Sequence, residues 1–186
     1  VATVDVSGRL VVPGLVDLHT HFYHKVSPLG ADPDPTFLPV GVTTAVDAGS
    51  SGWRTWAGLR DLVMARSRTR LYAFLNVAGP GMVAPELPDL EEPAEVQARE
   101  TLRCLTEDAD WLVGIKVRVM APGGTGAANA VPSLRKARAA ADQTGKRVMV
   151  HVYGTPIPLV QVLEHLRAGD VVTHTFNPTT HNILDA

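Results

Sequence analysis

Cysteine is almost absent from the chain: among its 186 residues, Cys104 is the only one. A single cysteine excludes an intramolecular disulfide and any zinc site built from several cysteines, and it favours a cytoplasmic protein. Apolar runs of about 18 residues or more are also missing, so the sequence predicts no transmembrane helix. The chain starts with neither a basic segment nor an initiator methionine, and we expect the gene to begin upstream of Val1.

An excess of charge of one sign is missing as well. The 17 lysines and arginines nearly balance the 19 aspartates and glutamates, which leaves a net charge of −2. This balance gives no electrostatic reason to expect a nucleic acid or an anionic membrane as a partner. With 45% hydrophobic and 19% charged residues, the composition is typical of a globular protein with a core. We therefore expect neither of these partners, and a homo-oligomer is compatible with the sequence.

Short apolar runs alternate with segments of helical composition, which is typical of βα units that build a parallel sheet. Strands are predicted at residues 15–21, 41–47, 70–77, 113–119, 147–153 and 170–176. Helices are predicted at residues 56–66, 93–107, 132–144 and 158–167, with Pro132 in a first turn and Gly145 as a helix end. Long loops are expected at residues 27–39 and 79–93. The turn-like pair Ser7 and Gly8, flanked by alternating apolar residues, predicts a β-hairpin within residues 1–12.

Two histidines, His19 and His21, lie at the end of the first predicted strand. Because side chains alternate along a strand, both imidazoles lie on one face, a few ångströms apart, as metal ligands do. The alternative is a pair of ordinary core or loop histidines, but each would then need a hydrogen-bond partner. The pair alone is weak evidence for a metal site.

His151 and His174 lie late in the fifth and sixth predicted strands. A single histidine on a buried strand is usually a core residue with a satisfied hydrogen bond. In a βα barrel, however, the carboxyl ends of different strands converge on one rim, where active sites are built. The coincidence of both residues at strand ends therefore favours a shared site with His19 and His21.

Lys116 lies within the apolar fourth predicted strand, where an unpaired ammonium is costly to bury. Burial lowers the pKa of a lysine and makes its neutral amine available to react with carbon dioxide, which gives a carbamate, an anionic ligand able to bridge two cations. The alternatives are a lysine that extends to the rim or one that pairs with a carboxylate such as Asp47. These considerations alone leave the choice open.

The segment VPGLVDLHTH at residues 12–21 resembles the signature of the amidohydrolase superfamily of metal-dependent hydrolases. Five further segments resemble its dihydroorotase-like branch, which includes amidohydrolase and deacetylase metallohydrolases. They are YHK at residues 23–25, GVTTAVDAG at 41–49, GIKVR at 114–118, VHV at 150–152 and THTFN at 173–177.

The resemblance implies an α/β fold, a (β/α)₈ TIM-type barrel that is incomplete here, with about six βα units. Residues 1–12 would be the edge of a small β-sandwich domain, and residues 13–186 the partial barrel. By position, the resemblance assigns His19 and His21 to the more buried metal, a carboxylated Lys116 to the bridge, and His151 and His174 to the second metal. It implies about two divalent ions, zinc by ligand preference, and a bridging hydroxide as nucleophile.

One element of the family pattern is not found. The general base would be an aspartate at the end of the eighth strand, and neither Asp47 nor Asp185 occupies that position. An eight-unit barrel needs about 250 residues. We therefore expect the base beyond Ala186 and expect the 186-residue chain alone to be an inactive, truncated hydrolase.

The resemblance to the deacetylase branch implies a small-molecule acylated substrate as the partner, and it favours cleavage of an acyl amide or acyl ester, such as an N-acetyl or O-acetyl carboxylic acid. Arg118 and His24 are the candidate substrate-binding residues. One alternative is a cyclic amide hydrolase of the dihydroorotase or hydantoinase type. Another is a non-catalytic relative that keeps the barrel for assembly, although retention of all five ligand positions argues against it.

Overall fold

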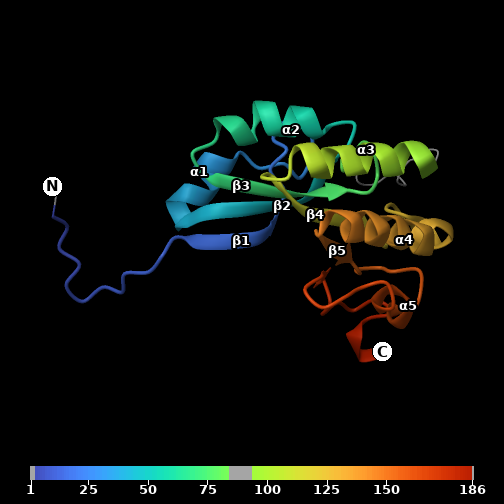
Figure 1. Ribbon diagram of the computed structural model, residues 1–186. Coiled ribbons are helices and arrows are strands. Elements are labelled where there is room, and N and C mark those ends of the chain that lie inside the picture. Colours follow the sequence, from blue (N-terminus) through green and yellow to red (C-terminus); the bar gives the residue numbers. More distant parts are fainter. Residues whose placement is uncertain (1–2, 84–93, 186) are drawn as a thin grey trace.

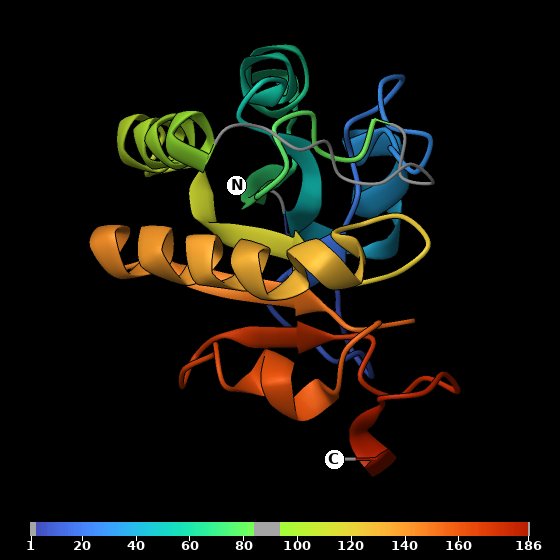
Figure 2. The ribbon, with the colours of Figure 1, turned by 90° about the vertical axis from the view of Figure 1, so that its right-hand side faces the viewer.

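Six parallel strands form one sheet in the computed structural model, which describes residues 3–83 and 94–185. In sheet order the strands are β1 (Leu15–Thr20), β2 (Val42–Gly52), β3 (Arg70–Asn76), β4 (Leu112–Arg118), β5 (Arg147–His151) and β6 (Val171–Thr173). The sheet curls, and the helices cover its outer side (Figures 1 and 2). The predicted fold class, an incomplete TIM-type barrel, is thus confirmed.

The helices follow the strands in the manner of βα units. They are α1 (Pro33–Phe37), α2 (Trp56–Leu62), α3 (Ala94–Glu107), α4 (Gly126–Thr144) and α5 (Leu159–Leu163), with 3-10 turns at Leu38–Val40, Met64–Arg66 and Ile183–Asp185. The short α1 lies inside a segment that the sequence predicts as loop. Within the described residues, no helix is long and apolar enough to cross a membrane.

Helix α4 begins earlier than predicted, at Gly126 rather than at Pro132. Pro132 therefore lies inside the helix, where its ring removes one backbone hydrogen bond. The alanine-rich segment 127–130 favours helix and extends it toward the amino end. Leu134 and Ala137 are buried in the core, so the packing of α4 offsets the lost hydrogen bond.

Alternation along the strands gives the sheet two different faces. In β3, Leu71, Ala73 and Leu75 belong to the larger apolar cluster, which also contains side chains of α2, α3 and α4. Tyr72 and Phe74 belong to a smaller cluster on the opposite face, inside the barrel. Because all the strands are parallel, their carboxyl ends meet at one edge, and side chains that point inward there face one another.

The amino-terminal segment does not form the predicted hairpin in residues 3–12. The chain turns at Ser7 and Gly8, where the Arg9 N–H donates to the Val6 carbonyl over 2.9 Å, but neither side of the turn is a strand. The segment is exposed and leads away from the sheet (Figure 1). A lone short hairpin with nothing to pack against is marginally stable, which explains the difference. Residues 1 and 2 of the predicted hairpin lie outside the described residues. The same holds for residues 84–93, which belong to the predicted loop at 79–93.

Candidate metal centre

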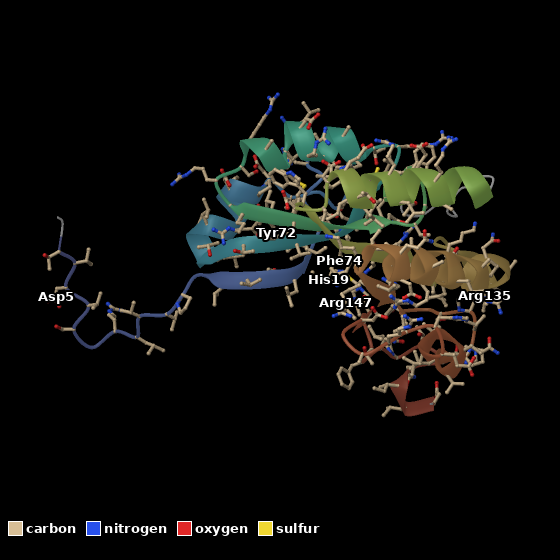
Figure 3. The ribbon with its side chains drawn as sticks, viewed as in Figure 1. Asp5, His19, Tyr72, Phe74, Arg135 and Arg147 are labelled. Carbon is tan, nitrogen blue, oxygen red and sulfur yellow. The ribbon has the colours of Figure 1, made fainter. Side chains whose placement is uncertain are left out.

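One cavity of about 420 Å³ lies at the carboxyl ends of the strands. His19 comes from β1, Lys116 from β4 and His151 from the last position of β5, while His21 and His174 directly follow β1 and β6. Figure 3 labels His19 at this end of β1. The structure therefore brings all five predicted metal ligands to the wall of one cavity.

The four imidazoles are close neighbours. The ring centroids of His19 and His21 lie 5.6 Å apart, and those of His19 and His174 lie 5.0 Å apart. The rings of His151 and His174 are closer still, at 4.5 Å. Parallel pairing explains this placement, because the register aligns His151 with Thr173 and so sets His174 beside it.

Burial keeps these imidazoles neutral. Burial and, second to it, the nearby Lys116 together lower the pKa of His19 to about 3, that of His21 to about 4 and that of His151 to about 3. Burial also lowers the pKa of His174. Neutral imidazole is the protonation state that binds a metal ion, so the environment suits ligation at neutral pH.

Lys116 is 1% exposed, which excludes a side chain that extends to the rim. Its Nζ donates to Thr173 Oγ1 over 3.3 Å, and Thr173 Oγ1 donates in turn to the Val150 carbonyl over 3.1 Å. Burial lowers the Lys116 pKa to about 7, although Asp47 opposes the shift. A substantial fraction of the amine is therefore neutral at neutral pH.

Of the two predicted substrate-binding residues, Arg118 lines the cavity and His24 does not. Arg118 is buried and lines the cavity together with the apolar side chains of Leu29, Met82 and Met120. His24 is not part of the cavity lining: its Nδ1 lies 3.4 Å from the Gly30 carbonyl, within the loop that follows β1. The substrate-binding role of His24 therefore stays a prediction, whereas Arg118 is placed at the cavity wall.

Sequence reasoning missed two residues behind the histidines and the lysine. Ser50 Oγ lies 2.9 Å from His21 Nδ1, and Gly49 lies against the Lys116 side chain. The signal in the sequence is the run GSSG at residues 49–52, small residues that continue a buried strand. Small residues leave room for side chains from neighbouring strands.

The side chains that line the cavity are of the types that bind divalent metal ions. Among residues 3–83 and 94–185, no three histidine, cysteine, aspartate or glutamate side chains are arranged to hold one ion together. The wall of the cavity nevertheless supplies four neutral imidazoles and a partly neutral amine, and imidazole is the commonest ligand of zinc and related ions. The residue types therefore match a metal centre.

Comparisons with known proteins agree on one family. The profile of the Amidohydrolase family matches residues 10–179. A deacetylase of Agrobacterium fabrum is 37% identical over 94% of this chain and 42% of its own length. A deacetylase of Brucella anthropi is 36% identical over 95% of this chain and 44% of its own length. The chain thus spans less than half of these curated relatives.

Solved structures show the same similarity. A dihydroorotase superposes with a TM-score of 0.80 at 35% identity, over 91% of this chain and 53% of the other. An adenine deaminase superposes with a TM-score of 0.83 at 30% identity, over 93% of this chain and 46% of the other. The histidines and Lys116 lie within residues 10–179, the range that the family profile matches.

Proposed function

Because the chain belongs to the amidohydrolase family, we propose that it forms the metal centre of a hydrolase that cleaves an acyl amide or acyl ester bond, as a deacetylase does. One observation carries this proposal: four neutral histidines and a buried lysine, from four strand ends, line a single cavity. The deacetylases among its relatives support the acyl specificity. The single cysteine of the sequence supports a cytoplasmic location.

We assign the metal ligands as follows. His19 and His21 would hold one divalent ion, His151 and His174 a second, and Lys116 would be shared between them. Zinc is the first candidate, because imidazole nitrogen and anionic oxygen are its common ligands. When bound, the ions would supply a water-derived nucleophile at neutral pH and polarise the acyl carbonyl.

Lys116 becomes an oxygen ligand by reacting with carbon dioxide. The neutral amine attacks the carbon of carbon dioxide, an N–C bond forms, and one proton leaves to solvent, so that an anionic carbamate remains. The lowered pKa of Lys116, about 7, supports this step because the neutral amine is accessible near neutral pH. The Thr173 hydroxyl holds the amine toward the sixth strand.

Arg118 would bind an anionic group of the substrate. Arg118 is buried and lines the cavity. A guanidinium there can bind a substrate carboxylate through its positive charge and through two parallel hydrogen bonds. Leu29, Met82 and Met120 would contact the apolar part of the substrate. This lining supports an N-acetyl or O-acetyl carboxylic acid as the substrate class.

A cyclic amide hydrolase is the second candidate. It is favoured by the dihydroorotase, which superposes with a TM-score of 0.80 at 35% identity. The same metal ligands would serve both reactions, so the substrate alone distinguishes them. A purely structural role is less well supported, since such a protein has no need for five metal-ligand side chains around one cavity.

Acetate release from N-acetyl and O-acetyl carboxylic acids tests the proposal. The full-length protein, loaded with Zn²⁺, should release acetate, and its variant His19→Ala should not. His165→Ala is the matched control, because His165 lies outside the cavity lining and should leave the rate unchanged. Ring opening of dihydroorotate without acetate release would favour the cyclic amide alternative, and no hydrolysis of either class would contradict both.

A further inference from the structure

A second cavity, of about 520 Å³, lies at the amino ends of β3 and β4, at the end of the sheet opposite the proposed metal centre. The strand register creates this amino-end cavity. Ala73 pairs with Leu112, the first residue of β4, so Arg70, Leu71 and Tyr72 of β3 extend beyond the neighbouring strand. The two cavities share no lining residue, so a ligand bound here would not touch the proposed metal ligands.

Apolar and aromatic residues form part of the wall of the amino-end cavity. Met64 and Leu71 are buried there, and Tyr72 and Trp111 are half-buried. Trp111 packs against the larger apolar cluster and Tyr72 against the smaller one, so both rings are supported by the core. Aromatic rings fixed in this way offer a large apolar surface to a ligand. The wall can therefore hold an apolar or aromatic group.

Charged side chains of both signs line the same cavity. They are Arg68, Arg70 and Asp110, and all three are exposed. Within residues 3–83 and 94–185, none of the three forms an ion pair, whereas Arg60, for example, pairs with Asp108 over 2.8 Å. Opposite charges that line one cavity without pairing with each other can both be used by a ligand that carries both charges.

Asp34 fixes the segment that carries the two arginines. Its carboxylate accepts hydrogen bonds of 2.9 Å from the backbone N–H groups of Arg68 and Thr69, and one of 2.8 Å from the Thr69 hydroxyl. The backbone next to Arg70 is therefore held in place before a ligand binds, which lowers the entropic cost of binding. Asp34 also attracts the charge of Arg68, so Arg70 is the stronger site for an anionic group.

We propose that the amino-end cavity binds a free α-amino acid with an apolar or aromatic side chain. At neutral pH such a ligand carries both a carboxylate and an ammonium. Arg70, with Arg68 beside it, holds the carboxylate, because a guanidinium offers charge and paired N–H donors to it. Asp110 accepts hydrogen bonds from the ammonium. Tyr72 and Trp111 contact the side chain of the ligand.

Calorimetric titration of the full-length protein with three related compounds tests this proposal. Phenylalanine carries both charges and an aromatic ring, hydrocinnamate lacks the ammonium, and phenethylamine lacks the carboxylate. We expect phenylalanine to bind at least about 10-fold more tightly than either of the others, because each of them loses one charge-assisted contact. Equal affinity for hydrocinnamate would show a plain anion site and overturn the proposal, as would no binding of either phenylalanine or leucine.

Variants of the exposed charged residues show where the ligand binds. Arg70→Gln should weaken binding of phenylalanine about 10-fold and leave that of phenethylamine unchanged, and Asp110→Asn should weaken phenylalanine but not hydrocinnamate. Arg135→Gln is the control, because Arg135 is an exposed arginine of α4 outside the cavity (Figure 3). Wild-type affinity for phenylalanine in both Arg70→Gln and Asp110→Asn would overturn the proposal, whether or not the protein hydrolyses acyl bonds.

Discussion

The side chain of Lys116 lies directly against the α-carbon of Gly49. A β-carbon added at Gly49 would lie 2.6 Å from Lys116 Cβ and 2.7 Å from Lys116 Cγ, closer than real β-carbons approach other atoms. Gly49 also has a φ of +91°, which other residues rarely adopt. A glycine on β2 therefore makes the room in which a lysine from β4 can be buried.

Gly49→Ala should destabilise the protein and displace Lys116. The positive φ alone costs about 1 to 3 kcal/mol for a residue with a β-carbon, and the collision with Lys116 adds to this. Gly41→Ala is the control, since Gly41 has a φ of +83° but no atom within 4 Å of an added β-carbon. Denaturant unfolding should show a larger loss for Gly49→Ala, and equal losses would contradict the close approach.

Lys116→Ala should abolish hydrolysis, because the proposed anionic ligand is lost. A small carboxylic acid such as formate should restore part of the rate by supplying a carboxylate in its place. Lys116→Arg should remain inactive with or without formate, since a guanidinium does not form the carbamate. Acetate release is the measurement, and full activity in Lys116→Arg would exclude the bridging role.

The metal-free protein should lose stability as the pH falls below about 6.5. The pKa values of His19 and His151 are about 3 in the folded protein, below those of the unfolded chain. The unfolded chain therefore binds more protons in this window, and acid favours it. Melting temperatures between pH 8 and pH 5 should fall in the wild type and fall less in His151→Ala. Parallel curves would contradict the buried, neutral imidazoles.

The strands, and the placement of the five proposed metal ligands at strand ends around one cavity, could be predicted from the sequence because both depend on local pattern. Apolar runs fix where β4 and β5 lie, and the alternation of side chains places Lys116 and His151 on the inner face. Boundaries set by packing could not be predicted in this way. Helix α4 continues past Pro132 because its buried face outweighs one lost hydrogen bond, and the segment 3–12 forms no hairpin because nothing packs against it.

Residues that contact the proposed ligands from behind, such as Ser50, could not be predicted from the sequence. Ser50 lies 29 positions from His21 along the chain, and the contact between them exists only after β1 and β2 pair. His24, by contrast, has the residue type and the position expected of a substrate ligand. In the structure its Nδ1 lies 3.4 Å from the Gly30 carbonyl, a contact within the loop that the sequence pattern does not report.

Metal content tests the central claim most directly. The intact protein, purified and then equilibrated with Zn²⁺, should contain about two ions per chain by elemental analysis. His19→Ala and His151→Ala should each lower that content and the hydrolytic rate together, whereas His165→Ala should change neither. Unchanged metal occupancy in both His19→Ala and His151→Ala would contradict the assignment of this cavity as the metal centre.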